Sequence, residues 1–205
     1  IRIAAANTGG ATIAGAAGFL VKAGAAHVEI TGFLLTHAAG TSRIEVGAHH
    51  IRLSRNVFAA TGEGAYITVA GDDTEIAYNE FRDKSTIGNM IDVRGDDGQI
   101  ARRVWIHHNY FHDFRNAGGN GAETIRFGLS GLSMSMGEGL IEHNLFVRCV
   151  GENELISVKS GGNTIRYNTF LDSPGAQLTL RHGNENLVWT RLWIGNAGKA
   201  DKPPV

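Results

Sequence analysis

A four-residue pattern, with Asn in its second place and Phe in its fourth, recurs five times along the chain. Successive Asn residues are 23, 30, 35 and 24 positions apart. Repeats of this length are typical of solenoids, in which each unit buries its apolar face only against its neighbours. The repeat therefore restricts the chain to a stacked architecture. The five Asn residues are Asn56, Asn79, Asn109, Asn144 and Asn168.

Two short segments of alternating polarity accompany each repeat, and none shows the period of an amphipathic helix. We therefore predict an all-β fold, a parallel β-helix of about seven to eight rungs over residues 1–196, followed by a tail at 197–205. Trp193 takes the place of a further Phe, with Arg191 in the Asn place. The strands expected before each Asn are 51–53, 75–77, 104–106, 140–142 and 164–166. Those expected in the second segment are 44–46, 66–69, 90–93, 124–127, 155–158 and 178–180.

The recurrence of Asn and Phe at fixed places in each coil has a physical explanation. Asn tolerates a left-handed backbone, and its side chain can hydrogen-bond to the next Asn of the stack. Phe at a fixed inward place can stack on itself through the core. We interpret both residues as structural.

Composition excludes several other classes. The formal charge of −1 shows no excess of basic residues, which a nucleic-acid-binding protein would need. No apolar run is long enough for a membrane span. The 28 Gly without a three-residue period fit repeated tight turns rather than collagen. The single Cys149 cannot form an internal disulfide.

The two long steps of the repeat contain insertions. One holds residues 95–98, and the other holds residues 116–121 and 129–139. Insertions in a solenoid emerge as loops on one face, which is often the binding face. Both flank the segment 151–160.

That segment places Glu152 and Glu154 two residues apart and Lys159 five residues later. Residues i and i+2 of a strand share a face, so both carboxylates can meet one hard cation. Lys159 is an odd number of residues from Glu154, which would put it on the opposite face of an unbroken strand. The strand must therefore bend if all three residues serve one site. Aligning the apolar residues of 156–158 with those of 178–180 predicts Arg181 beside Lys159.

Three motifs in this order resemble polysaccharide lyase family 6, which contains alginate lyases and a dermatan-degrading chondroitinase. They are the stretch 120–128, the stretch 151–160 and Leu180-Arg181-His182-Gly183. The resemblance runs from about residue 13 to residue 189. It implies a right-handed parallel β-helix that binds Ca²⁺, secreted or periplasmic, with an anionic polysaccharide as its partner.

The resemblance also assigns roles to residues. It implies Asn120, Glu152 and Glu154 as calcium ligands, Lys159 as the base and Arg181 as the acid. Glu123 has the same offset from its strand as Glu154, so we expect it to approach the ion as well. Glu123 makes the motif more similar to that of the alginate lyases than to that of the dermatan-degrading member.

The implied reaction is β-elimination, in which a base removes the proton on C5 of a uronate. A divalent cation with oxygen ligands offsets the charge that develops on the neighbouring carboxylate. A guanidinium hardly gives up its proton, so we interpret Arg181 as stabilising the enolate or the leaving O4, with a water or His182 delivering the proton. Arg126, His112, Arg115 and His182 are the candidate substrate contacts.

Four functions remain open at this point. The first is an alginate lyase, and the second is a lyase for dermatan sulfate or another uronate polymer. The third is a mannuronan C5-epimerase, which returns the proton instead of expelling O4. The fourth is a non-catalytic glycan-binding β-helix. The fold alone permits all four, whereas a pure binder has no need for both Lys159 and Arg181.

Overall fold

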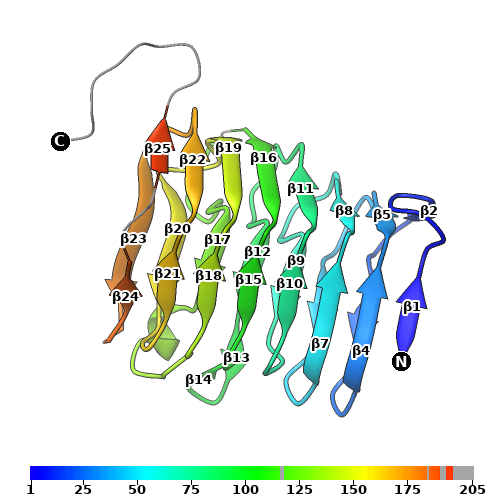
Figure 1. Cartoon of the computed structure of the whole chain (residues 1–205), viewed down its shortest axis with the longest axis horizontal. Coiled ribbons are helices and arrows are strands. Elements are labelled where there is room, and N and C mark those ends of the chain that lie inside the picture. Colours follow the sequence, from blue (N-terminus) through cyan, green and yellow to red (C-terminus); the bar gives the residue numbers. More distant parts are fainter. Residues whose placement is uncertain (116–117, 184, 190–192, 196–205) are drawn as a thin grey trace.

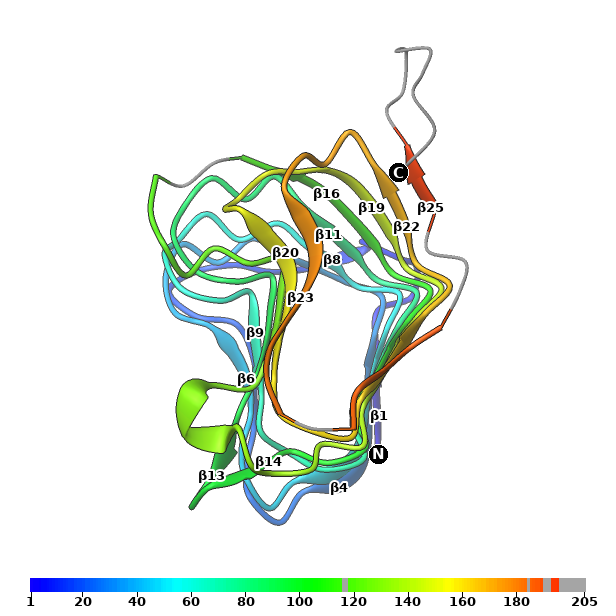
Figure 2. The same cartoon turned by 90° about the vertical axis from the view of Figure 1, so that its left-hand side faces the viewer.

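The computed structural model describes residues 1–115, 118–183, 185–189 and 193–195. Its strands stack side by side along the long axis of the molecule (Figure 1). They form three parallel sheets around one interior, as the view along the stack shows (Figure 2). The fold is the expected right-handed parallel β-helix, with eight strands in two sheets and seven in the third within the described part of the chain.

Each coil contributes one strand to each sheet. The first sheet contains β1 (Arg2–Ala4), β4 (Ala26–Thr31), β7 (His49–Ser54), β10 (Glu75–Ala77), β15 (Trp105–His107), β18 (Leu140–Glu142), β21 (Thr164–Arg166) and β24 (Leu187–Val188). The second contains β2 (Ala11–Ile13), β5 (Phe33–Leu35), β8 (Val57–Phe58), β11 (Glu80–Arg82), β16 (Tyr110–Phe114), β19 (Leu145–Cys149), β22 (Thr169–Leu171) and β25 (Trp193–Gly195). The third contains β3 (Leu20–Val21), β6 (Ser42–Ile44), β9 (Ile67–Val69), β12 (Ile91–Val93), β17 (Ile125–Phe127), β20 (Glu154–Lys159) and β23 (Ala176–His182).

The Asn and Phe repeats form two continuous columns, as predicted. Each Asn side chain donates to the Asn of the next coil, at 3.0–3.2 Å from Asn56 through to Asn168. The rings of Phe58, Phe81, Phe111, Phe146 and Phe170 stack at 4.6–4.8 Å between centroids. These columns fix the register between coils on one side of the interior.

The left-handed corner, however, lies one residue earlier than we expected. The residues before each Asn have φ between 52° and 58°, and no Asn of the repeat has a positive φ. Because the chain turns before the Asn, the amide is directed inward and is at most 2 % exposed. The five left-handed residues are Arg55, Tyr78, His108, His143 and Tyr167.

Two predicted positions are wrong by a small shift. The strand expected at 44–46 is observed at β6, where Ile44 pairs with Val69 as the last residue of the strand. A shift of two residues keeps the same face, so alternation alone cannot exclude it. At the C-terminal end Ile194, not Trp193, pairs with Phe170. Arg191 and the tail at 197–205 lie outside the described residues.

The third sheet has one face in the core and one face outward. Ile125 and Phe127 of β17 are completely buried among the core side chains, and Arg126 between them lies on the outer face. The insertions border this face. The hairpin of β13 (Gly95–Asp96) and β14 (Gln99–Ile100) and the short 3₁₀ helix η1 (Ser130–Leu132) protrude along one edge of it (Figure 2). In the described part of the chain, no helix is long and apolar enough to cross a membrane.

Candidate active site

The segment before β20 is hydrogen-bonded to the segment before β17. Glu152 accepts hydrogen bonds from the backbone N–H groups of Gly121 and Ala122, at 2.5 and 2.8 Å, through one carboxylate oxygen. Gly121 has a φ of +96°, a conformation that glycine adopts without strain. Gly151 lies so close that a Cβ there would overlap the carbonyl oxygen of Ala122. The two segments therefore approach closely enough to share one site.

Glu123 is a buried carboxylate on the lower of these two coils. It is 1 % exposed, and Asn89 donates to its side chain at 2.8 Å and to its backbone carbonyl at 3.0 Å. Burial alone would raise the pKa of Glu123. Hydrogen bonds from its own backbone, Lys159 and Asn89 outweigh burial and hold that pKa below its usual value. Glu123 is therefore ionised at neutral pH.

Glu154 begins β20 and has one paired and one unpaired oxygen. Its Oε1 accepts from Arg181 at 2.7 Å. Its Oε2 is buried and accepts no hydrogen bond from any described residue. A buried carboxylate oxygen without a donor is unfavourable, so this atom marks a place where a positively charged ligand would be stabilised.

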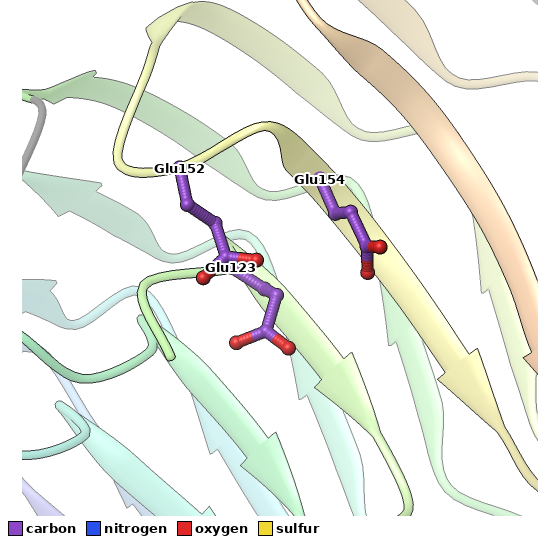
Figure 3. A group of neighbouring side chains, drawn as sticks. All are labelled: Glu123, Glu152 and Glu154. Carbon is purple, nitrogen blue, oxygen red and sulfur yellow. The ribbon is translucent and has the colours of Figure 1, made fainter. Parts of the chain in front are cut away.

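The three carboxylates form one cluster. Each of Glu123, Glu152 and Glu154 has an oxygen within 4.8 Å of an oxygen of the other two. Figure 3 shows them converging from the segment before β17, the segment before β20 and the start of β20. Two oxygens bound to one Ca²⁺ at about 2.4 Å can lie no more than about 4.8 Å apart. The spacing and the all-oxygen chemistry fit a hard divalent cation.

Lys159, at the other end of β20, reaches back over the outer face to this cluster. Its Nζ lies 3.1 Å from Oε1 of Glu123. The pairing of β20 with β23 shifts between Val158 and Lys159, but the extra residue of this β-bulge, Arg181, lies on β23, so the shift is not the bend expected within β20. The alignment of Ile156 with Leu178 is as predicted.

The same bulge corrects the expected neighbour of Lys159, which pairs with His182 rather than with Arg181. Arg181 is left without a register partner on β20. Its guanidinium contacts Glu154 instead.

An ion-pair network continues the site along the outer face of the third sheet. Asp92 is 3 % exposed and accepts two hydrogen bonds from Arg126, at 3.0 and 2.9 Å, and one from Arg94 at 2.5 Å. Nη1 of Arg126 also lies 3.9 Å from Oε2 of Glu123. Two guanidinium groups share one carboxylate here, and Arg126 connects this network to the cluster.

Asn120 and two carboxylates of the cluster border a common hollow. Its volume is about 540 Å³, and it is open to solvent. Asn120, Glu152, Glu154 and Arg181 all line it. The residues expected to hold a cation and the residue expected to act as acid are thus brought together.

Two candidate substrate contacts lie elsewhere. His112 is on β16 in the second sheet, where its ring contacts Glu80 and Asp113 at 3.1 and 2.7 Å. Arg115 is exposed just after β16, and its backbone N–H donates to the carbonyl oxygen of Lys84. His182, in contrast, is exposed at the end of β23 opposite Lys159. Of the four candidates, Arg126 lies on β17 beside the cluster, and His182 lies on β23, the neighbour of β20.

The sequence interpretation missed Asn89, Asp92 and Arg94. Asn89 stands two residues before the inward Ile91, as Glu123 and Glu154 stand before Ile125 and Ile156. Asp92 is the register partner of Arg126. Aligning the coils on their inward residues would have placed all three beside the site.

Comparisons with known proteins find one matching family and several similar structures. The family model described as Chondroitinase B matches residues 37–202, which is more than half of the chain. None of the curated proteins compared with the chain matches it.

Similar solved structures include three lyases. The alginate lyase AlyGC of family PL6 is 28 % identical with a TM-score of 0.79, over 91 % of this chain and 27 % of AlyGC. The alginate lyase AlyF-OU02, in complex with G6, is 25 % identical with a TM-score of 0.77, over 91 % of this chain and 43 % of that one. A mannuronic acid specific family 6 lyase from human gut microbiota is 25 % identical with a TM-score of 0.67, over 95 % of this chain and 46 % of that one. The chain thus spans less than half the length of each of these structures.

Proposed function

Because the chain belongs to the chondroitinase B family, polysaccharide lyase family 6, we propose that it cleaves a uronate polysaccharide by β-elimination, with alginate as the polymer. One observation carries the proposal. An amine, a guanidinium and three carboxylates converge on the outer face of the third sheet, beside an open hollow. A binding module has no need for an amine held against a buried carboxylate.

Lys159 is the proposed base. Its amine must be neutral to take the C5 proton of the uronate. The contact between its Nζ and Glu123, at 3.1 Å, holds the amine at the cluster. A substrate carboxylate placed between the cluster and Arg126 would bring C5 toward this amine. A positioned general base contributes about 10²- to 10⁴-fold to such a step.

Arg181 and His182 are proposed to act on the leaving group. Arg181 keeps its proton and offers N–H groups to the developing charge on the enolate or on O4. His182 is exposed opposite Lys159 and can pass a proton, directly or through water, to the departing oxygen. The C5–H bond and the C4–O4 bond both break, and a double bond forms between C4 and C5. The proton from C5 remains on Lys159.

Glu123, Glu152, Glu154 and Asn120 are the proposed ligands of a calcium ion. The buried, unpaired Oε2 of Glu154 and the mutual spacing of the carboxylates fit such an ion. When bound, the ion would supply positive charge that offsets the charge developing on the substrate carboxylate. This chain's own part is to hold the three carboxylates together, with Gly121 and Ala122 fixing Glu152.

Alginate is favoured over dermatan sulfate because the similar structures named above include alginate lyases. A lyase that degrades such a large polymer before its uptake works in the periplasm or outside the cell, which is where we propose that this protein acts. Incubation of the chain with alginate and, in parallel, with dermatan sulfate tests the proposal. The absorbance of an unsaturated uronate should rise with alginate and stay flat with dermatan sulfate. A flat trace with both polymers would overturn the lyase, and unsaturation with dermatan sulfate alone would overturn the choice of alginate.

A further inference from the structure

A second hollow lies on the same outer face, toward the N-terminal coils. Its volume is about 640 Å³, which is within the usual range for ligand sites. Arg43, Thr68 and Arg94 line it, and the hairpin residues Gly95 and Asp96 form one wall. Arg43, Thr68 and Asp92 occupy successive register positions on β6, β9 and β12, so the hollow follows the rows of the third sheet.

A chain of contacts joins this hollow to the candidate active site. Arg94 lines the hollow and donates to Asp92, and Asp92 also holds Arg126. Arg126 lies beside Glu123, which contacts Lys159. Charged side chains therefore extend without a break from the second hollow to the proposed base.

Of the two arginines in the second hollow, one has no carboxylate partner among the described residues. Arg43 is exposed and forms no ion pair with any residue whose position is described. Arg94 donates only through Nε in the described contacts, which leaves its two terminal nitrogens for a ligand. Glu45 and Asp96 also line the hollow, where they accept backbone N–H groups of Ala23 and Asp97 and form no described ion pair with Arg43 or Arg94.

The spacing of the coils suits a polymer. Neighbouring strands lie about 4.8 Å apart, close to the length of one sugar in an extended (1→4)-linked chain. From β20 to β6 there are four such steps, or about 19 Å. A uronate chain laid across the coils from Lys159 would bring a carboxylate to Arg43 about four sugars away.

We propose that the hollow lined by Arg43, Thr68 and Arg94 is a distal subsite for a uronate of the same polymer. The subsite depends on the proposed function, which it extends by giving the substrate a direction along the solenoid axis. Arg43 and Arg94 bind the carboxylate, and Asp92 is a positioning residue that holds Arg94. Thr68 offers a hydroxyl to the sugar ring.

The test measures binding without cleavage. All variants carry Lys159→Ala, and titration calorimetry compares a saturated alginate trisaccharide with an octasaccharide. We expect Arg43→Ala to weaken the binding of the octasaccharide by about threefold to tenfold, as for the loss of one charged hydrogen bond at a partly exposed site. The trisaccharide, which is too short to reach the hollow from Lys159, should bind unchanged. Arg55→Ala is the matched control, because Arg55 is an exposed arginine in the turn between β7 and β8.

The outcomes separate the two proposals. Equal binding of the octasaccharide by the Arg43→Ala and Arg55→Ala variants would overturn the subsite, and so would equal weakening of both oligosaccharides by Arg43→Ala. In either case the proposed lyase would stand if the unaltered chain cleaves alginate. If the unaltered chain neither cleaves alginate nor binds either oligosaccharide, the proposed function fails, and the subsite fails with it.

Discussion

Lys84 is a lysine enclosed by the fold, at 1 % exposure, outside the candidate active site. Its ammonium donates to the carbonyl oxygen of Gly64 at 2.8 Å and to Thr86 at 3.2 Å, and lies 4.7 Å from the centre of the Tyr66 ring. Burial lowers the pKa of Lys84 to about 8, although Glu63 acts in the opposite direction. The folded protein therefore binds this proton less tightly than the unfolded chain does.

The sign of the pH dependence follows from that difference. Between the folded pKa of about 8 and the unfolded value of 10.5, the unfolded chain binds more protons, so stability rises with pH. The shift corresponds to about 3 kcal/mol. We expect the stability difference between the unaltered chain and the Lys84→Met variant to change by up to that amount from pH 8 to pH 10.5. Urea unfolding at several pH values measures it, and a difference that is constant with pH would refute the assignment.

At the scale of elements, the Asn column is the feature that a single substitution should destabilise most. Asn109 accepts from both the backbone and the side chain of Asn79, and donates to the carbonyl oxygen of Ile76 and to Asn144. Truncating it leaves several buried polar groups without partners. Each such group costs about 1–3 kcal/mol.

We therefore expect Asn109→Ala to lower the free energy of unfolding by about 3 kcal/mol or more. Asn7→Ala, at an exposed position near the N-terminus, should change it by less than about 0.5 kcal/mol. Chemical denaturation followed by circular dichroism compares the two. Similar losses in both variants would mean that the column contributes nothing beyond an ordinary surface Asn.

The columns could be predicted because identical residues recur at identical places in each coil. Asn and Phe kept their spacing from the flanking strands even where the insertions lengthened the step between coils. The alignment of Ile156 with Leu178 was correct for the same reason. Position within the coil, rather than distance along the chain, was the reliable quantity.

Other details could not be read from alternation. Moving β6 by two residues leaves Ile44 on the same face, so both placements satisfy the pattern. The β-bulge opposite Val158 and Lys159 changes the neighbour of Lys159 because its extra residue, Arg181, lies on β23, and alternation does not reveal which strand takes such a residue. The contact between Lys159 and Glu123 depends on side-chain reach across coils, which spacing does not encode.

For the whole molecule, a cation bound between two coils would tie them together. Glu123 precedes β17, while Glu152 and Glu154 belong to the next coil, so one ion would link successive turns of the solenoid. A ligand that binds only the folded state stabilises it by about 2.7 kcal/mol at one hundred times its dissociation constant. We expect calcium to raise the melting temperature of the unaltered chain and a chelator to reverse the rise.

The control removes charge without removing volume. Glu152→Gln combined with Glu154→Gln should abolish the calcium-dependent rise, whereas Glu185→Gln, at an exposed position elsewhere, should leave it intact. Thermal unfolding monitored by circular dichroism measures this without reference to activity. A rise of the same size in the double variant would place the ion elsewhere.

The rate of alginate cleavage by the Lys159→Ala variant tests the role of Lys159 as the base most directly. Product is followed by the absorbance of the unsaturated uronate, with Lys22→Ala as an exposed-lysine control and circular dichroism to verify folding. Loss of a general base predicts a fall of about 10²-fold or more in kcat for Lys159→Ala and none for Lys22→Ala. A folded Lys159→Ala variant that cleaves alginate as fast as the unaltered chain would show that Lys159 is not the base.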